Sequence, residues 1–132
     1  MDDEVDWQTL EERAWAAREN AYAPYSQFSV GAAVVTDSGQ VFTGGNIENA
    51  SLGLTICAER VAISGAVQAG CRRFAGIIIV TKMEEPVAPC GACRQFISEF
   101  SRDLPVVSVG RDGDRRSWSL SELLPVRFER FS

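Results

Sequence analysis

The chain contains no histidine, and so it lacks both the commonest general base and the commonest nitrogen ligand of metal ions. Acid–base chemistry must fall to Asp, Glu, Lys, Tyr or Cys, and zinc ligands are expected to be thiolates. No apolar run approaches the roughly 20 residues of a membrane-spanning helix. The acidic start, MDDEVDW, lacks the basic and then apolar pattern of a secretion signal. We therefore expect a cytoplasmic protein without a membrane partner.

Positive charge is also scarce, with 13 Lys and Arg against 18 Asp and Glu and a net charge of −5. An acidic surface repels phosphate backbones, so the charge argues against polymeric nucleic acid as a partner. A length of 132 residues predicts a single domain, 1–132. A domain of this size buries roughly two-thirds of its unfolded surface, which is enough for a core without disulfides.

Hydrophobic periodicity and turn signals predict helices and strands that alternate along the chain. The predicted helices are 6–22, 58–69, 90–100 and 120–124, and the predicted strands are 28–36, 41–44, 75–81 and 105–110, with an edge strand after the RDGD turn. The continuous apolar run at 75–81 is typical of a strand that is covered on both faces. This order predicts an α/β fold with helices on both faces of one sheet.

Three of the four cysteines lie in two short stretches, TICAER (55–60) and PCGACR (89–94). A disulfide framework belongs to oxidising compartments, and no secretion signal supports one here. A thioredoxin-like Cys-x-x-Cys pair would leave Cys57 and Glu59 unexplained. Both interpretations are therefore minor alternatives to a metal site.

A structural zinc site usually has four protein ligands, and Cys71 would have to be the fourth. Cys71 follows Cys57 by a whole predicted helix, about 20 Å at 1.5 Å per residue, and is better explained as a half-buried free thiol. Three ligands with an open position are typical of a catalytic zinc. Cys57, Cys90 and Cys93 each fall at a predicted helix N-terminus, where free N–H groups and the helix dipole stabilise thiolates.

Charged residues flank these cysteines. Three thiolates on Zn²⁺ leave a net charge of −1, which Arg60 is expected to offset, although a solvated surface arginine is the alternative. The role of Arg94 stays open between these two. Glu59, two residues after Cys57, is placed to take a proton from water and return it to a leaving nitrogen. Its alternative role is that of a first-turn glutamate favoured by the helix dipole.

Cys-x-Glu followed by Pro-Cys-x-x-Cys is the pattern of zinc deaminases. Together with YAPYSQFSVGAAV, FTGGNIENAS, TICAERVAI, PCGACRQ and ELLPVRF, it resembles the small, homotetrameric cytidine deaminases over nearly the whole chain. The resemblance implies a three-layer α/β/α sandwich with a five-stranded mixed sheet and one zinc per subunit. It also implies hydrolysis of cytidine and deoxycytidine to uridine and deoxyuridine, with release of ammonia, in pyrimidine salvage.

The resemblance assigns roles to individual residues. Zinc is held by Cys57, Cys90 and Cys93, and Glu59 protonates N3 of the ring and then the departing amine. The backbone of Ala58 and Pro89 contacts the edges of the substrate ring, and Phe28 stacks on its face. Asn46 and Glu48 contact the ribose, and Phe128 reaches the substrate from a neighbouring subunit. Tyr25 pairs with Arg60 near the subunit interface. From the residues alone, Asn46 and Glu48 are equally compatible with a polar loop, and Phe28 with a core position.

Two positions depart from the family pattern. Gly45 replaces the usual cysteine of GCN, which is not a ligand. Leu52 replaces an aromatic residue that reaches the 5′ end of the sugar across a subunit boundary, and a leucine cannot donate a hydrogen bond. This puts the 5′-hydroxyl contact and the preference among nucleosides in question.

Three rival functions remain at the level of sequence. A blasticidin-S deaminase shares the zinc motif, but the NIENAS stretch favours an ordinary nucleoside. A polynucleotide deaminase needs a basic channel, which a short acidic chain does not offer. A non-enzymatic zinc domain would use the metal only for folding and would not need Glu59. Phe128 and Phe131, in a short tail, are expected to be poorly buried on a lone monomer, which favours the tetramer.

Overall fold

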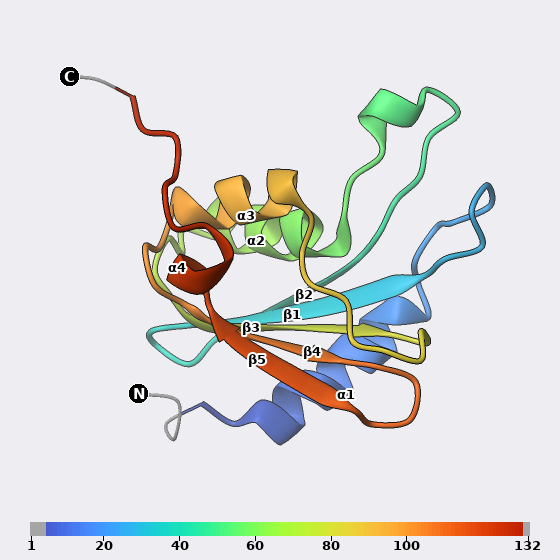
Figure 1. The fold of residues 1–132 in the computed structure, drawn as a ribbon, viewed down its shortest axis with the longest axis horizontal. Coiled ribbons are helices and arrows are strands. Elements are labelled where there is room, and N and C mark those ends of the chain that lie inside the picture. Colours follow the sequence, from blue (N-terminus) through green and yellow to red (C-terminus); the bar gives the residue numbers. More distant parts are fainter. Residues whose placement is uncertain (1–4, 131–132) are drawn as a thin grey trace.

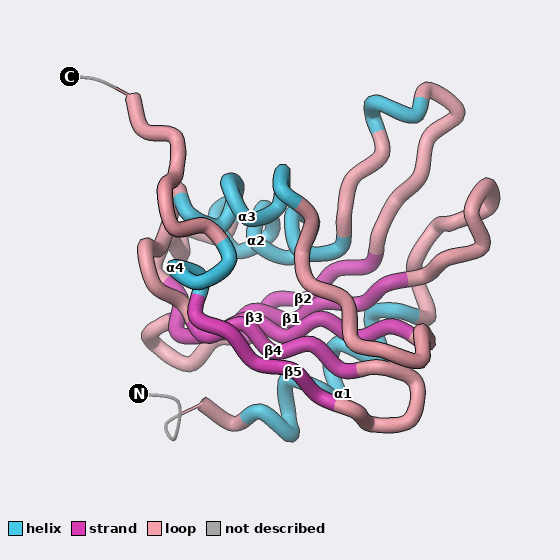
Figure 2. The backbone as a smooth tube through the Cα atoms, in the orientation of Figure 1, coloured by secondary structure: helices cyan, strands magenta, loops and turns pink. Residues whose placement is uncertain are grey.

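The computed structural model describes residues 5–130 and contains a five-stranded mixed sheet with helices on both faces (Figure 1, Figure 2). The strand order is β2-β1-β3-β4-β5; only β3 and β4 are parallel, and the other neighbours are antiparallel. The strands are β1 (Val30–Thr36), β2 (Val41–Gly45), β3 (Phe74–Thr81), β4 (Pro105–Val109) and β5 (Arg115–Ser119). The helices are α1 (Trp7–Arg18), α2 (Ala58–Gln68), α3 (Gly91–Ser98) and α4 (Leu120–Leu123), with a 3₁₀ turn at Leu52–Leu54. This confirms the predicted α/β/α sandwich.

Two cores pack against the two faces of the sheet. In the middle strand β3, Ile77 and Ile79 belong to the core under α2 and α3, whereas Ile78 and Val80 belong to the core over α1. Successive side chains of a strand point to opposite faces, so a strand buried on both sides is apolar throughout. The apolar run of β3 thus explains why this strand lies at the centre.

The helices approach the sheet closely because the contact positions are small. A Cβ atom added at Gly31 in β1 would lie 2.1 Å from the backbone oxygen of Ala14 in α1. A Cβ atom at Gly44 in β2 would lie 2.7 Å from the backbone oxygen of Ala58 in α2. The second approach brings the first turn of α2 directly over the end of β2.

Three predicted boundaries were wrong by two residues or more: the end of α1, the start of β1 and the end of α3, which is Ser98 and not residue 100. Helix α1 ends at Arg18, four residues before the predicted end, because Tyr22 leaves the helix to bridge Ile47. Strand β1 begins at Val30 and not at residue 28, because the Phe28 carbonyl accepts a hydrogen bond from the side chain of Asn46 instead of joining the ladder. The first two differences come from contacts distant in sequence, which local patterns do not reveal.

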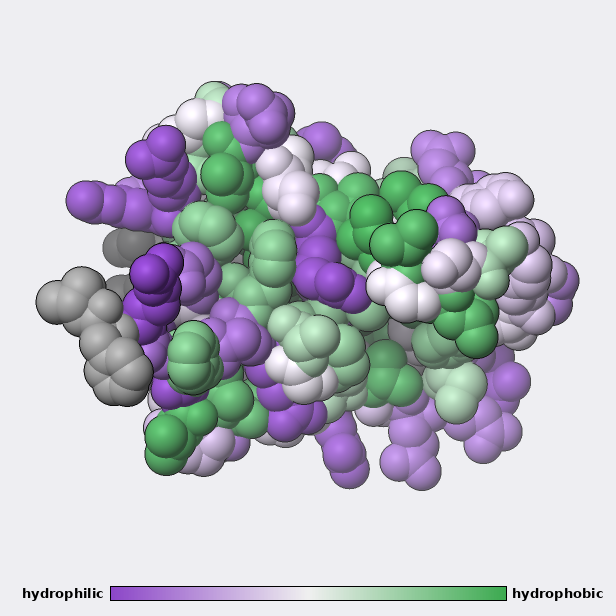
Figure 3. All heavy atoms as spheres, turned by 90° about the horizontal axis from the view of Figure 1, so that it is seen from above, coloured by the Kyte–Doolittle hydropathy of each residue, from purple (hydrophilic) through white to green (hydrophobic). Residues whose placement is uncertain are grey.

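Two segments, 19–29 and 46–57, rise beyond the edge of the sandwich on the side of α2 and α3 (Figure 1). They carry exposed apolar side chains: Tyr22, Tyr25, Phe28, Ile47, Leu52, Leu54 and Ile56. A view from above shows hydrophobic residues at the surface in this half of the molecule (Figure 3). Of the helices in the described part, none is long and apolar enough to cross a membrane.

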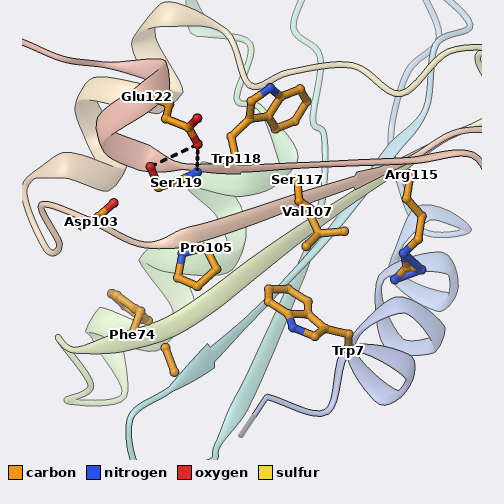
Figure 4. A pocket seen from close by; sticks show the side chains of 11 residues that line it. Trp7, Phe74, Asp103, Pro105, Val107, Arg115, Ser117, Trp118, Ser119 and Glu122 are labelled. Atoms are coloured by element: carbon orange, nitrogen blue, oxygen red, sulfur yellow. Dashed lines mark hydrogen bonds between the residues drawn. The ribbon is translucent and has the colours of Figure 1, made fainter. Parts of the chain in front are cut away.

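A separate hollow of about 770 Å³ lies beside β4 and β5 (Figure 4). Its lining includes Trp7, Phe74, Arg115 and Trp118, and it contains neither a cysteine nor any predicted site residue. At its rim Glu122 accepts a hydrogen bond from the backbone N–H of Ser119, which begins α4 (Figure 4). Ser119 and Glu122 thus form a capping box at the start of the last helix.

Candidate active site

Three thiols converge where α2 and α3 begin. The sulfur atoms of Cys57, Cys90 and Cys93 all lie within 4.8 Å of one another, and those of Cys57 and Cys90 are 4.0 Å apart. Cys57 precedes α2 and Cys90 precedes α3, whereas Cys93 lies in the first turn of α3 and is buried. Residues more than 30 positions apart in sequence thus form one cluster.

This donor set fits a tetrahedral zinc ion. At a Zn–S distance of about 2.3 Å, tetrahedral angles place two sulfurs roughly 3.8 Å apart. The 4.0 Å between Cys57 and Cys90 is close to that value, and all three thiols are free. Cys71 lies outside the cluster, and its thiol contacts the Gln40 side chain at 3.0 Å. The cluster therefore provides three protein ligands and leaves one coordination position open.

Neither of the two helix N-termini at this site is capped by a side chain. Cys57 and Cys90 are the N-cap residues of α2 and α3, and neither makes a side-chain capping hydrogen bond. The first N–H groups of both helices are therefore available to a negative charge, and both helix dipoles point their positive ends at the sulfurs.

The cluster favours a thiolate at Cys57. The pKa of Cys57 is lowered to about 5, chiefly because its sulfur accepts a hydrogen bond from Cys93 and also because Arg60 lies beside it. The pKa of Cys93 is raised, because its thiol donates to Cys57 and because it is buried. The Nη2 atom of Arg60 is 3.6 Å from the Cys57 sulfur. Arg60 therefore lies where the expected charge compensation requires it.

Glu59 is the only acidic residue in the first turn of α2, and only 5% of its surface is exposed to solvent. Burial raises the pKa of its carboxyl above the ordinary value, and the negative charge of Cys57 acts in the same direction. An exposed first-turn glutamate would simply interact with the helix dipole. The burial of Glu59 beside three thiols argues against that simpler explanation.

The thiols and Glu59 border a cavity of about 310 Å³. Most of the predicted substrate residues line the same cavity: Phe28, Asn46, Glu48 and Ala58, together with Val30, Thr55, Ile79, Val87 and Ala88. Cys57 and Cys90 line it as well, whereas Cys93 and Pro89 are buried and are not among the lining residues. The structure therefore brings two of the three predicted metal ligands and most of the predicted ring and ribose residues to one pocket.

Asn46 and Glu48 already have structural partners. The Asn46 side chain accepts from the N–H of Val30 and donates to the carbonyl of Phe28, both at 2.8 Å. Glu48 accepts hydrogen bonds from the backbone N–H groups of Tyr25 and Ser26 and from the Ser26 hydroxyl, and the last of these is the main reason its pKa is lowered. Each side chain retains a further hydrogen-bonding position, an N–H of the amide and a lone pair of the carboxylate.

Other predicted residues lie outside this cavity. Phe128 is 72% exposed and lies against α3, where its backbone exchanges hydrogen bonds with the Gln95 side chain. Tyr25 is 56% exposed, and no hydrogen bond joins it to Arg60 within the described residues. Leu52 is 74% exposed on the 3₁₀ turn. Within a single chain, these three residues therefore do not line the cavity.

Sequence reasoning missed two contacts around the site. The Ser26 hydroxyl links Glu48 to the N–H of Phe28, and Gln27 between them has a positive φ of 61°. The Arg94 guanidinium donates to the carbonyl of Pro89 at 2.7 Å. Ser26 lies within YAPYSQFSVGAAV and Arg94 within PCGACR, but neither stretch indicates which partner its side chain contacts.

An α/β/α sandwich with three thiols and a buried glutamate at its helix N-termini has the site of a zinc-dependent deaminase. Comparison with known proteins agrees: a family model described as the cytidine and deoxycytidylate deaminase zinc-binding region matches residues 5–109. The chain belongs to this deaminase family.

Relatives and solved structures match over most of their lengths. The chain is 47% identical to a cytidine deaminase of Halalkalibacterium halodurans, over 94% of this chain and 95% of the relative. It is 45% identical to that of Sporosarcina psychrophila, over 86% and 85%. The crystal structure of cytidine deaminase from Burkholderia pseudomallei superimposes with a TM-score of 0.90 and 51% identity, covering 94% of this chain and all (100%) of that one.

Proposed function

We propose that this protein hydrolyses cytidine to uridine and ammonia, and deoxycytidine to deoxyuridine. The observation that carries the proposal is the buried Glu59 carboxyl beside three thiols in a pocket that also presents Phe28, Asn46 and Glu48. Membership of the deaminase family and the names of the relatives support the same reaction.

Cys57, Cys90 and Cys93 are the residues that would hold the zinc ion. When bound, zinc supplies a Lewis acid that makes a water molecule a nucleophile near neutral pH. Arg60 offsets part of the thiolate charge through its contact with the Cys57 sulfur. The free N–H groups at the two uncapped helix N-termini assist it.

Glu59 carries the protons of the reaction. It takes a proton from the attacking water and delivers it to N3 of the ring while the new C4–O bond forms. It then carries the second proton of that water to the exocyclic amine. The C4–N bond breaks, ammonia leaves, and a carbonyl group remains at C4. Water supplies the oxygen and both protons, so no oxidant or further reactant is needed. A buried carboxyl with a raised pKa suits a group that alternates between acid and base.

The substrate is oriented by groups around the cavity. Phe28 offers an aromatic face to the ring, and the backbone N–H of Ala58 would reach one of its edges. The Pro89 carbonyl, which accepts a hydrogen bond from Arg94 and keeps a second lone pair, would accept from the other edge. The remaining N–H of Asn46 and lone pair of Glu48 would bind a ribose hydroxyl as donor and acceptor. A cavity of about 310 Å³ suits a small ligand such as a nucleoside.

Assembly and cellular role belong to the same proposal. We take the 132 residues as one deaminase domain that forms a homotetramer with shared active sites, acting on nucleosides in cytoplasmic pyrimidine salvage. The exposed apolar side chains of segments 19–29 and 46–57, and the exposed ring of Phe128, support an interface with further copies. Phe131 lies outside the described residues. Light scattering that shows a monomer at micromolar concentration would contradict the shared-site arrangement.

The experiment compares wild type, Glu59→Ala and a control, Glu12→Ala, which removes an exposed glutamate of α1. Cytidine loss is followed by ultraviolet absorbance, and zinc is assayed on the same samples. We expect about one zinc per chain in all three proteins and a loss of turnover of about 10²–10⁴-fold in Glu59→Ala alone. Turnover by Glu59→Ala at the wild-type rate would contradict the role of Glu59; no turnover by zinc-loaded wild type would contradict the substrate.

A further inference from the structure

We infer that Arg94 is the positioning residue for Cys90: its guanidinium fixes the peptide that carries this zinc ligand and ties it to the C-terminal segment. The inference rests on the proposed zinc site. Arg94 follows Cys93 directly, and its side chain binds two backbone carbonyl groups. Its Nε atom donates to the Pro89 carbonyl at 2.7 Å, and its Nη1 atom donates to the Leu123 carbonyl at 2.9 Å.

Arg94 contacts the backbone on both sides of Cys90. The Pro89 carbonyl belongs to the peptide bond that leads into Cys90, and the backbone N–H of Arg94 donates to the Cys90 carbonyl at 3.0 Å. Fixing these two peptide planes fixes the φ and ψ angles of Cys90 and therefore the direction of its Cα–Cβ bond. Cys90 makes no side-chain capping bond, so these contacts supply its orientation.

Cys90 is the ligand that most needs such support. It is exposed, whereas Cys57 is half-buried and Cys93 is buried. It also ends the segment 82–90, which contains no helix or strand. An exposed ligand at the end of an irregular segment has more freedom to turn away than one within a packed helix. Cys90 is therefore expected to be the first of the three ligands to dissociate from the zinc ion.

The other end of the contact is anchored by the C-terminal segment. The Leu123 carbonyl belongs to the last residue of α4. The start of this helix is stabilised by the capping box of Ser119 and Glu122. The next residue of α3, Gln95, holds the backbone of Phe128 at 3.0 and 3.1 Å. Arg94 and Gln95 of α3 thus both bind the C-terminal segment. Of these two, Arg94 also binds the carbonyl of the peptide bond before Cys90.

The two arginines next to the cysteine motifs therefore act differently. Arg60 contacts a sulfur atom, so its charge matters. Arg94 contacts two carbonyl groups, so the planar fork of its guanidinium matters, because it presents two N–H donors in fixed directions. A lysine at position 94 would keep the charge but could not reproduce both hydrogen bonds. Arg94→Lys therefore separates the effect of the two hydrogen bonds from the effect of the positive charge.

The test measures zinc release from wild type, Arg94→Lys, Arg94→Ala and Arg72→Ala, the last removing an exposed arginine outside the site. Zinc-loaded proteins are mixed with a chromogenic chelator, and the first-order release rate is recorded. We expect wild type and Arg72→Ala to release zinc at the same rate. We expect both Arg94 variants to release it about 10–100-fold faster, the cost usually seen when a partner of a metal ligand is removed.

The outcomes separate the inference from the proposed function. Release from Arg94→Lys at the wild-type rate would overturn the inference, whether or not Arg94→Ala releases zinc faster, because charge or bulk would then suffice. If Arg94→Ala does not fold, Arg94→Lys, which keeps the charge and a long side chain, carries the test. A folded wild type that binds no zinc would overturn the proposed function itself.

Discussion

The helix on one side of the sheet and the two on the other begin in different ways. Helix α1 begins at Asp6, whose carboxylate accepts hydrogen bonds from the backbone N–H and the hydroxyl of Thr9 at 3.1 and 2.7 Å. Helices α2 and α3 begin at Cys57 and Cys90, and neither sulfur caps its helix. The α1 side therefore satisfies its own helix end, whereas the opposite side leaves two helix ends open to a ligand.

This difference separates stability from chemistry within one small fold. A capped N-terminus uses its N–H groups internally and contributes to stability. Two uncapped N-termini that converge direct N–H groups and positive dipole ends at the same point, where they stabilise thiolates. The α2–α3 side thus forgoes local capping and gains a metal site.

Replacing Cys57 by a residue that caps the N-terminus of α2 should remove a zinc ligand and stabilise the helix instead. Of the variants considered, this one should have the largest effect. Cys57→Ser and Cys57→Ala both remove a ligand, so both should lose bound zinc and turnover. Serine at the N-cap position should also make zinc-free protein about 1 kcal/mol more stable than alanine does. Metal analysis and urea unfolding of the two variants check this; equal stabilities would show that position 57 is not a functional N-cap.

Crowding the α1 side should cost stability without changing the site. Gly31→Ala would place a Cβ atom against the backbone of α1, so the free energy of unfolding should fall by about 1–3 kcal/mol. Gly65→Ala, on the exposed face of α2 with open space around it, is the matched control and should gain about 0.5–1 kcal/mol. Zinc content should be normal in both, and zinc loss in Gly31→Ala would show that the two sides are coupled.

Changing a carboxylate of the pocket should weaken binding and leave the metal in place. Glu48→Gln would convert an acceptor-only group into an amide and disturb its three hydrogen bonds from Tyr25 and Ser26. We expect KM for cytidine to rise about tenfold, with normal zinc content. Steady-state kinetics with cytidine check this, and an unchanged KM would remove Glu48 from the ribose site.

Removing the charge of the α1 cap, while an amide oxygen remains to accept from Thr9, should have the smallest effect. The hydrogen bonds from Thr9 lower the pKa of Asp6 below 3.8 in the folded protein, so its contribution to stability is present above that value. It is lost as the pH falls through the lowered pKa. Asp6→Asn should therefore unfold slightly more easily than wild type at pH 7 and equally at strongly acidic pH, with unchanged turnover. A turnover defect would contradict the separation of the two sides.

The ligand set was predictable from sequence because cysteine spacing and helix starts are local features. The positions of Cys57, Glu59 and the Cys90–Cys93 pair followed from short motifs and from the signals that begin α2 and α3. The burial of β3 on both faces also followed from its apolar run, whereas the order of the strands came only from the structure. The position of Glu59 in the first turn of α2 followed from its spacing after Cys57, but its burial was visible only in the structure.

Contacts between distant segments were not predictable. The early end of α1 depends on the bridge between Tyr22 and Ile47, and the late start of β1 depends on the side chain of Asn46. The role of Arg94 stayed open because Pro89 and Leu123, its two partners, are 34 residues apart. Such contacts depend on the assembled fold, whereas composition and spacing report only local preferences.

The central claim is that two uncapped helix N-termini jointly hold a zinc ion through three thiolates and leave one position open. X-ray absorption at the zinc edge of the purified protein tests it most directly. We predict three sulfur ligands at about 2.3 Å and one lighter oxygen ligand. A shell of four sulfurs would mean a closed structural site that recruits a fourth cysteine, and a shell without sulfur would mean that the three thiols do not bind the metal.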